Sequence, residues 1–284
     1  GYSSAASDVY KRQNGKYNFI GQKGDTYPQQ KPLNDNAISI SMDAQMLLNG
    51  ISRSLFATAD DELRPVMNGV YFDIHTDDLT FVASDGHKLV RLRNLAVKSP
   101  ERASFILPKK PANLLKNLLA KESEQVLIKF DDNNAYITCT NFEMVCRLIE
   151  GRYPNYNSVI PQENPFKVTI DRISFLNALK RVSVFSNPAS SLVKLHLKDS
   201  LITVSAQDID FSTSAEERIV CQFDGTELSI GFKATYLIEI LGNISSEEVV
   251  LELADPSRAG LIVPSENDED EDLLMLLMPM MFND

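Results

Sequence analysis

The stretch "ISISMDAQMLLNGISRSLFATAD" (38–60) decides the fold, because it returns further along the chain as "KVTIDRISFLNALKRVSVFSNPA" (167–189). Each copy predicts an alternating strand, then an aspartate, Asp43 or Asp171, and then an amphipathic helix. Aspartate suits the position before a helix because its carboxylate accepts the free amide hydrogens of the first turn. The two copies therefore predict two domains built on the same plan.

The repeat continues beyond these stretches. "DDLTFVAS" (77–84) matches "DSLITVSA" (199–206), and "ILPKKPANLLKNLLAKESEQVLIKF" (106–130) matches "SIGFKATYLIEILGNISSEEVVLEL" (229–253). Each unit therefore predicts a strand, a helix, several strands, a second helix and further strands. This order is typical of an α+β fold of repeated, pseudo-symmetric domains, each with two helices packed on one face of antiparallel sheets.

Short proline-containing joints indicate the domain limits. "GDTYPQQKP" (24–32) echoes "GRYPNYNSVIP" (151–161), and Tyr-Pro stiffens a linker because proline fixes its own φ and biases the preceding residue away from helix. A joint before the first unit predicts a further unit upstream. Its last strand would be "KYNFI" (16–20), which we expect to have nothing before it to pair with. "GYSSAASDVYKRQ" has no apolar periodicity, and we interpret it as a non-native leader. The expected division is residues 1–14 for the leader, 15–36 for the remnant of a first domain with its linker, 37–161 for a middle domain and 162–284 for a C-terminal domain.

Composition and charge narrow the functional class. The 284 residues are 43 % hydrophobic and carry a net charge of −11, so only a local basic face, and no general affinity for nucleic acid, is expected. Cys139, Cys146 and Cys221 have no metal-like spacing, and we expect buried, reduced thiols in a cytoplasmic protein. No stretch approaches the roughly 18–20 apolar residues of a membrane span. The sequence contains no phosphate-binding glycine motif, and no cofactor or metal is expected.

Four motifs, in one order and spacing, resemble a known family. They are "LRPVMNGVYFDI" (63–74), "VASDGHKLVRL" (82–92), "IEGRYPNYNSVIP" (149–161) and "LLMPMM" (276–281). Together they resemble the bacterial sliding clamp, the beta subunit of the DNA polymerase III holoenzyme. The resemblance covers the second and third of that family's three domains and the tail of the first.

The resemblance implies a DNA-clamp fold and a function without catalysis. Two chains of that family form a homodimer ring that encircles double-stranded DNA, slides, and confers processivity on the replicative polymerase. The implied partners are duplex DNA, the DNA polymerase III alpha subunit, the clamp loader and other proteins that carry clamp-binding peptides. No membrane partner is implied.

The resemblance also implies a groove between the two domains that receives short peptides. The turn in "SDGHKL" (84–89) forms one wall, the joint at 151–161 a second, and the apolar end of the chain a third. Ser158 stands where arginine is common, and the chain ends Met-Pro-Met-Met-Phe-Asn-Asp where the family ends near Met-Pro-Met-Arg-Leu. We expect His87 and Lys88 to supply polar contacts at the rim. The expected groove residues are Met67, Ser84, Gly86, His87, Lys88, Leu89, Pro154, Ser158, Val159, Leu276, Met278, Pro279 and Met280.

The end of the chain, "DEDEDLLMLLMPMMFND" (268–284), is both acidic and apolar. The residues from Leu274 to Pro279 alternate in an expected strand, so one face packs on the sheet while the other looks out. Because Pro279 cannot donate a hydrogen bond, we expect the chain to leave at the sheet edge. The methionines suit a surface that accepts several apolar partners. The acids of "SENDEDED" (265–272) are expected to form a solvated loop before this edge strand.

Basic residues on helix faces are the candidates for contacting DNA. The resemblance places these helices toward a pore, where lysine contacts phosphates without reading bases. A solvated helix face would give the same pattern, so both interpretations stay open. The expected DNA-facing residues are Arg53, Arg64, Lys109, Lys110, Lys116, Lys180 and Arg181, with Lys121 and Lys233 in the same segments.

The resemblance assigns Val184, Phe185, Glu216 and Glu217 to the interface between two chains. Apolar residues at a helix end could equally belong to the core. Ring closure needs a first-domain edge as well, so we expect this chain by itself to be a monomer or a weak dimer that is not a ring.

Two other functions stay open on the sequence alone. Asp85 and His87 could form an acid–base pair in a small hydrolase, although no nucleophile motif accompanies them. The chain could also be a scaffold that binds peptides without encircling DNA.

Overall fold

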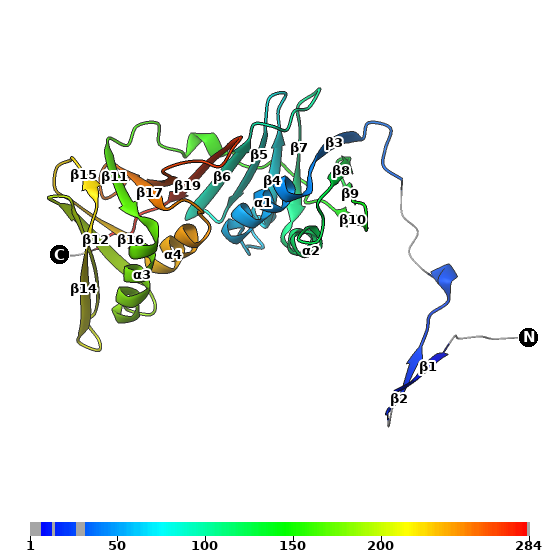
Figure 1. The fold of residues 1–284 in the computed structure, drawn as a ribbon, viewed down its shortest axis with the longest axis horizontal. Coiled ribbons are helices and arrows are strands. Elements are labelled where there is room, and N and C mark those ends of the chain that lie inside the picture. The colour runs from blue at the N-terminus through cyan, green and yellow to red at the C-terminus, as the bar shows by residue number, and fades with distance from the viewer. Residues whose placement is uncertain (1–6, 13–14, 27–31, 283–284) are drawn as a thin grey trace, which may run out of the picture. The chain divides into compact units, whose positions relative to one another are not determined.

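The structure, a computed structural model, describes residues 7–12, 15–26 and 32–282. It divides into two compact units, Gly1–Asn36 and Ala37–Asp284. In the first unit, β1 (Ser7–Arg12) pairs antiparallel with β2 (Gly15–Ile20), and a single 3₁₀ turn (Gly24–Thr26) follows (Figure 1).

The expectation that the strand at 16–20 has nothing before it to pair with is wrong. Ser7 lies opposite Ile20 and Arg12 opposite Gly15, so the partner strand comes from the segment interpreted as a leader. The physical reason is that strand pairing uses backbone N–H and C=O groups, which every sequence carries, so a segment without apolar periodicity can still pair.

The second unit confirms the α+β fold and the repeat. Each copy of the repeat begins with a strand, β3 (Ile38–Asp43) or β11 (Phe166–Asp171), and a helix, α1 (Ala44–Ser54) or α3 (Arg172–Val182). Asp43 and Asp171 cap these helices as predicted. The Asp43 carboxylate accepts the Gln45 amide at 2.8 Å, and Asp171 accepts that of Ser174 at 2.7 Å. The later helices are α2 (Lys109–Leu119) and α4 (Ala234–Gly242).

One sheet of nine strands runs through both copies of the repeat, in the order β15-β11-β17-β18-β19-β6-β5-β4-β7. Four-stranded sheets flank it, with the orders β10-β9-β8-β3 and β14-β13-β12-β16. Figure 1 shows the four helices together on one side of the nine-stranded sheet. The strands not yet bounded are β4 (Gly69–Ile74), β5 (Leu79–Ser84), β6 (Lys88–Asn94), β7 (Ala103–Pro108), β8 (Gln125–Phe130), β9 (Asn134–Thr138), β10 (Glu143–Arg147), β12 (Leu192–Lys198), β13 (Leu201–Asp208), β14 (Thr213–Val220), β15 (Gln222–Phe223), β16 (Leu228–Lys233), β17 (Glu248–Leu253), β18 (Gly260–Pro264) and β19 (Glu271–Leu277).

The last strand, β19, corrects the expectation of an edge strand. It pairs with β18 on one side and with β6 of the middle domain on the other, so it joins the two halves of the molecule. Leu273 and Met275 face the main core, whereas Leu274 and Leu276 belong to a second cluster. The apolar part of the strand has apolar side chains on both faces because each face packs against one of these two clusters. Alternation along one strand does not tell whether its second face is also covered.

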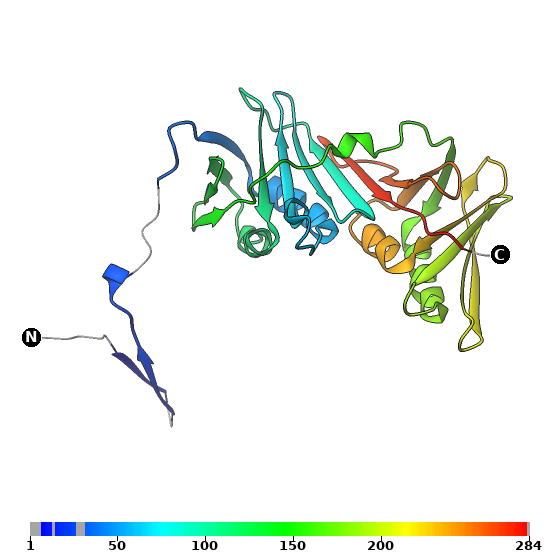
Figure 2. The same cartoon turned by 180° about the vertical axis from the view of Figure 1, so that it is seen from behind.

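The linker between the two halves covers the second cluster. Tyr153, Tyr156 and Ile160 come from the linker and pack there with Leu89 of β6 and Leu276 of β19. Figure 2 shows the linker crossing the nine-stranded sheet and the end of the chain running on from β19. The joint predicted at 151–161 is therefore also a packing element.

Candidate functional site

The turn between β5 and β6 is held by its own side chains. The Ser84 hydroxyl donates to the Lys88 carbonyl (2.8 Å) and accepts the Gly86 amide (3.1 Å). The Asp85 carboxylate accepts the backbone N–H groups of His87 (2.8 Å) and Lys88 (2.9 Å). Gly86 has a φ of 90°, a left-handed conformation that favours glycine. The turn is therefore firmly fixed and presents Gly86 and His87 to solvent.

Lys88 is not the rim residue that the sequence predicts. Its Nζ lies 2.8 Å from Asp85 Oδ2 and 3.3 Å from Glu239 Oε2, and 4.0 Å from the centroid of the Tyr236 ring. Only 6 % of its side chain is exposed. Burial lowers the pKa of Lys88, but the two carboxylates outweigh that effect and raise the pKa above its usual value. Since Glu239 and Tyr236 lie on α4, the buried ammonium fastens the turn to the C-terminal domain.

The acid–base pair considered for Asp85 and His87 has no geometric support. The Asp85 carboxylate is occupied by the Lys88 ammonium and two backbone amides. The His87 ring lies instead near Tyr236, with 6.2 Å between the ring centroids. Within the part of the chain that the structure describes, no hydrogen bond joins the Asp85 carboxylate to the His87 ring.

The end of the chain is tied to both domains. The Met278 amide donates to the His87 carbonyl and the Met280 amide to the Gly231 carbonyl, both at 2.8 Å. The Phe282 ring lies 4.6 Å from the Lys194 ammonium. Met278 is 42 % exposed, so this residue presents apolar surface beside the turn.

The linker supplies the third side of the candidate groove. Tyr153 stacks on Tyr71, with 4.6 Å between the ring centroids, and the Tyr156 hydroxyl donates to Asp73 at 2.8 Å. Burial raises the pKa of both linker tyrosines, so both hydroxyls stay protonated. With these rings turned inward, the linker residues between and after them face solvent; these are Pro154, Ser158 and Val159.

The predicted groove residues fall into two classes. Those that face solvent or are half-buried are Gly86, His87, Pro154, Ser158, Val159, Met278, Pro279 and Met280. Those that are buried beneath them or beside them are Met67, Ser84, Lys88, Leu89 and Leu276. Leu89 and Leu276 lie directly opposite each other in the β6–β19 ladder. The two domains therefore meet at an apolar floor formed by one leucine from each.

Arg64 lies at this turn as well. Its Nη2 donates to the Asp85 carbonyl at 3.4 Å, and a Cβ added to Gly86 would lie 2.9 Å from Arg64 Nη1. Its Nε also donates to Asp61 at 2.8 Å. The sequence predicts a DNA contact for Arg64, and the structure places its guanidinium beside the candidate groove.

Besides Arg64, which pairs with Asp61, three of the predicted DNA-facing residues are held in ion pairs. Arg53 bonds Asp268 and Glu271, Lys109 bonds Asp60, and Arg181 forms a bidentate pair with Glu217. The remaining lysines of that prediction have no ion pair among the described residues; they are Lys110, Lys116 and Lys180, together with Lys121 and Lys233. Apart from Lys233, whose ammonium lies 4.7 Å from the centroid of the Tyr236 ring, this second set has ammonium groups available to a ligand.

The acidic segment is the expected exposed loop only over residues 265–270, because Glu271 and Asp272 lie in β19 and are half-buried, and Asp268 and Glu271 pair with Arg53. Arg53 lies on α1 of the middle domain, whereas Asp268 and Glu271 lie just before and within β19. Asp272 of the same segment pairs with Arg91 of β6 at 2.8 Å. Asp268, Glu271 and Asp272 are therefore counter-charges across the domain junction, because β19 lies next to β6 and not at an edge.

The residues predicted for a chain–chain interface lie at one end of the C-terminal domain. Val184 and Phe185 are exposed in a 3₁₀ turn after α3 (Ser183–Phe185), and Glu216 and Glu217 lie on β14. β14 is an edge strand of its sheet. Glu217 faces α3, where it binds Arg181, so residues expected at two different surfaces form one pair.

The three cysteines are free thiols that differ in burial. Cys221 is buried as expected, whereas Cys139 and Cys146 are only partly buried; all three are free, and burial raises the pKa of Cys139 and Cys146 to about 11. Over the described ranges, no group of histidine, cysteine and acidic side chains could hold a metal ion, and no helix is both long and apolar enough to cross a membrane.

Sequence reasoning missed the side chains that join the domains, which are Arg91, Tyr153, Tyr156, Tyr236, Glu239 and Asp272. Two tyrosines in the joint "GRYPNY" were a local signal, since tyrosine often packs its ring and bonds its hydroxyl. The others carry no local signal, because their partners lie far away in the sequence.

Two family models, both for domains of the DNA polymerase III beta subunit, match consecutive parts of the chain. The model of the central domain matches residues 41–155, and the model of the C-terminal domain matches residues 157–281. Among curated relatives, the beta sliding clamp of Pseudomonas aeruginosa is 29 % identical over 245 residues, which cover 86 % of this chain and 66 % of the relative. That of Synechococcus elongatus is 28 % identical over 247 residues, covering 84 % and 65 %. The chain thus spans slightly less than two thirds of these relatives' length.

Solved structures give the same result. A sliding clamp from Pseudomonas aeruginosa bound to griselimycin is 26 % identical, with a TM-score of 0.90, and the match covers 97 % of this chain and 74 % of that one. A clamp from Bartonella birtlesii bound to griselimycin is 27 % identical, with a TM-score of 0.89 and coverage of 98 % and 74 %. Matched in consecutive domains, in sequence and in fold, the chain belongs to the beta sliding clamps, the family of the DNA polymerase III beta subunit.

Proposed function

We propose that the protein is a sliding clamp that encircles duplex DNA and tethers the replicative polymerase through a peptide-binding groove. The DNA polymerase III alpha subunit, the clamp loader and other proteins with clamp-binding peptides are its partners, and the working ring is a homodimer. It acts in the cytoplasm, without catalysis and without a cofactor.

The observation that carries this proposal is the meeting of three chain segments at the domain junction. The turn that holds His87, the linker that holds Val159 and the tail that begins at Met278 come from distant parts of the sequence, and the Met278 amide bonds the His87 carbonyl. Leu89 and Leu276 lie opposite each other beneath them. Fixed turns around an apolar floor are what a preformed peptide site requires.

The chemistry of this junction favours an extended, partly apolar peptide. The exposed side chains of these segments include Met278 and Val159, which are apolar, and methionine adapts to side chains of different shape. Affinity is then expected to rest on one or two buried anchor side chains of the peptide. A polymerase held in this way remains at high effective concentration near the primer end after it lets go of the DNA, which is the origin of processivity.

Griselimycin, the ligand of two related clamps, is a suitable probe of the groove. A variant that ends at Leu277 removes Met278 and the rest of the tail. We expect it to bind griselimycin at least roughly 30-fold more weakly in isothermal titration calorimetry, the effect of losing a hot spot. Met281→Ala is the matched control, because Met281 is 79 % exposed and should change affinity little.

Circular dichroism on both variants separates a lost contact from a lost fold. Equal affinity in the truncated and parent proteins would show that the tail is only core packing. A second candidate function is a peptide-binding scaffold that does not encircle DNA. Such a scaffold would bind griselimycin normally. It would be retained equally on a nicked circular plasmid and on the same plasmid after linearisation, whereas a ring would slide off the linear DNA.

A further inference from the structure

The linker side of the candidate groove is built on one short turn. Residues Tyr156–Ser158 form a 3₁₀ turn, and the Val159 amide donates to the Tyr156 carbonyl at 3.3 Å where this turn ends. The two residues differ in burial, because Tyr156 is 8 % exposed and Val159 is 56 % exposed. The position of the exposed valine therefore depends on what holds the buried tyrosine.

Strand β4 receives the Tyr156 side chain. Alternate residues of β4 enter the main core, so Tyr71 and Asp73 lie on the other face, which the linker tyrosines cover. The Tyr156 ring meets the Tyr71 ring edge to face, with 6.4 Å between the ring centroids. Its hydroxyl donates to Asp73 Oδ2 at 2.8 Å. A ring contact and a directional hydrogen bond therefore hold the same side chain on β4.

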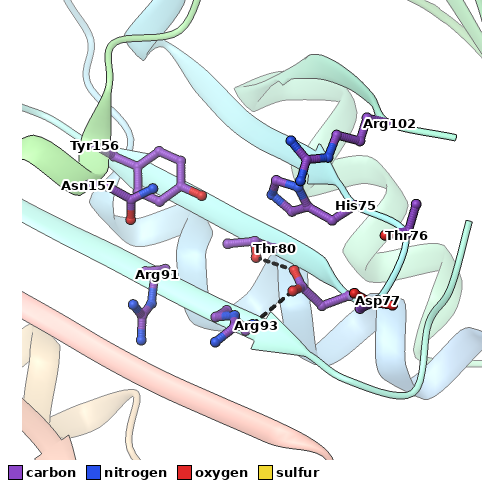
Figure 3. Close-up of a pocket in the computed structure, with 10 residues that line it drawn as sticks. His75, Thr76, Asp77, Thr80, Arg91, Arg93, Arg102, Tyr156 and Asn157 are labelled. Atoms are coloured by element: carbon purple, nitrogen blue, oxygen red, sulfur yellow. Dashed lines mark hydrogen bonds and ion pairs between the residues drawn. The ribbon is translucent and has the colours of Figure 1, made fainter.

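The Asp73 carboxylate is itself held in place. His75 Nε2 lies 3.2 Å from Asp73 Oδ2, the oxygen that accepts the tyrosine hydroxyl, and the His75 amide donates to the Asp78 carbonyl at 2.9 Å. In Figure 3 the Tyr156 hydroxyl points from the linker toward His75. Only 18 % of the Asp73 side chain is exposed. The linker tyrosine thus meets an acceptor of fixed orientation, which is largely out of solvent.

Tyr153, the other linker tyrosine, is held differently. Its ring stacks on Tyr71, but its hydroxyl is buried without a hydrogen-bond partner in the described part of the protein. A hydrogen bond weakens steeply as its angle departs from linear, whereas stacked rings accept a range of offsets. Burial and the neighbouring Asp73 raise the pKa of Tyr156, so its hydroxyl stays protonated and donates. The bond from Tyr156 to Asp73 is therefore the directional attachment of these two rings to β4.

We propose that Asp73 is a positioning residue of the peptide groove, which fixes Val159 at the groove through the Tyr156 hydroxyl. The inference rests on the proposed function, because the groove must bind a peptide. Asp73 lies beneath the linker and acts without touching the peptide. A turn that is already fixed on β4 removes the entropy cost of ordering it when the peptide binds, so the peptide binds more tightly.

A double-mutant cycle tests this coupling with griselimycin in isothermal titration calorimetry. Asp73→Ala and Tyr156→Phe should each weaken binding about fivefold, the effect of one side chain that must be ordered on binding. The double variant should bind no more weakly than either single variant, because both changes remove the same bond. Parent-like affinity in Asp73→Ala, or a double variant weakened by about 25-fold, the product of two independent effects, would overturn the proposal.

Two further variants separate positioning from general stability. Asp73→Asn keeps an oxygen that can accept the tyrosine hydroxyl, so it should bind griselimycin within about twofold of the parent. Thr80→Val is the matched control, because it removes a hydroxyl-to-aspartate bond of 2.9 Å, from Thr80 to Asp78, in the same sheet and without the linker (Figure 3). It should lower the melting temperature but not the affinity. Asp73→Asn as weak as Asp73→Ala, or an equal loss of affinity in Thr80→Val, would contradict a positioning role.

Failure of the groove itself is recognised with the parent protein. If the parent does not bind griselimycin, the proposed function fails, and the methyl resonances of Val159 then test the positioning by NMR without a ligand. These resonances should shift in Asp73→Ala and in Tyr156→Phe and stay in place in Thr80→Val. Unshifted Val159 methyls in Asp73→Ala would show that Asp73 does not position the linker, whatever the groove binds.

Discussion

A lysine side chain is seldom buried unless opposite charges compensate its ammonium, and Lys88 is such a case. Its ammonium lies between Asp85, Glu239 and the face of Tyr236. The first carboxylate belongs to the turn of the candidate groove and the second to α4. One side chain thus fixes the shape of the turn and its position on the neighbouring domain.

Lys88→Ala should lower the free energy of unfolding by about 3 kcal/mol, because it leaves a largely buried carboxylate without its partner. Lys180→Ala, at an exposed position on α3 without an ion pair among the described residues, should change it by less than about 0.5 kcal/mol. Urea denaturation followed by circular dichroism measures both. Similar values for the two variants would mean that the buried pair contributes nothing to stability.

Asp85 gives the same cluster a pH dependence. Burial raises the pKa of this carboxyl, but hydrogen bonds from the Lys88 ammonium and from the backbone of Lys88 and His87 outweigh burial and hold the pKa below its usual value. A lowered pKa in the folded state contributes stability above the unfolded pKa, and this contribution is lost as pH falls through the folded pKa. Asp85→Asn should therefore flatten the decline in melting temperature below about pH 4, as scanning calorimetry at several pH values can test. An unchanged pH profile would contradict this role.

Gly231 is the residue on which the tail rests. A Cβ at this position would lie 2.6 Å from the Met280 carbonyl oxygen and 2.9 Å from the Phe282 ring. Gly231→Ala should therefore displace the tail and weaken griselimycin binding by about tenfold, while the melting temperature changes little. Gly242→Ala is a matched control, because nothing lies within 4 Å of its added Cβ. If both variants bind griselimycin equally well, the position of the tail does not matter to the groove.

At the scale of elements, β19 and the acidic segment before it hold the molecule together. By pairing with β6, β19 joins the strands of the two halves into one sheet. Asp268 and Glu271 form ion pairs with Arg53, and Asp272 forms one with Arg91. The Arg53 side chain is only 15 % exposed. Hydrogen-bonded backbone and paired charges thus act at the same junction, and both come from the last part of the chain.

Arg53→Ala should lower the free energy of unfolding by about 2 kcal/mol, because it breaks two ion pairs in a partly buried place. Arg181→Ala breaks an exposed pair within the C-terminal domain and should cost less than about 1 kcal/mol. Guanidinium chloride is itself a salt and would screen these ion pairs, so unfolding is measured with urea, once at 50 mM and once at 500 mM sodium chloride. The cost of Arg53→Ala should persist at high salt. Equal costs for both variants would show that the junction pairs are no stronger than surface pairs.

At the scale of the whole molecule, unequal pairing of the basic residues decides which of them are available to DNA. Lys110 and Lys116 on α2 carry no ion pair among the described residues, whereas Arg53 and Arg181 are engaged. Changing Lys110 and Lys116 to glutamate should weaken retention on duplex DNA and reduce the slope of log affinity against log salt by about 2.

Griselimycin binding should be unchanged in the same variant, because α2 contributes no residue to the candidate groove. Lys98 and Lys129, two exposed lysines away from the helices and without an ion pair among the described residues, provide the matched double change to glutamate. Gel filtration of the protein with a nicked circular plasmid measures retention. Equal loss in both double variants would attribute the effect to net charge and not to the helix face.

The sequence by itself determined the repeat, the α+β class, the helix starts at Asp43 and Asp171 and the stretches that form the candidate groove. These features are readable because strand alternation, helix periodicity and capping depend on residues a few positions apart. The tyrosines of the joint and the glycine of the turn belong to the same local chemistry.

Only the tertiary structure decided that β19 lies inside a sheet, that Lys88 is buried and that Arg53 is paired. Arg53 and Glu271 are 218 positions apart, and Arg91 and Asp272 are 181 apart. A residue's type states what kind of partner it needs, but not which of many distant candidates will lie beside it. That choice is made when the two domains bury their apolar faces along a common sheet, because the charges on the joined strands must then find partners there.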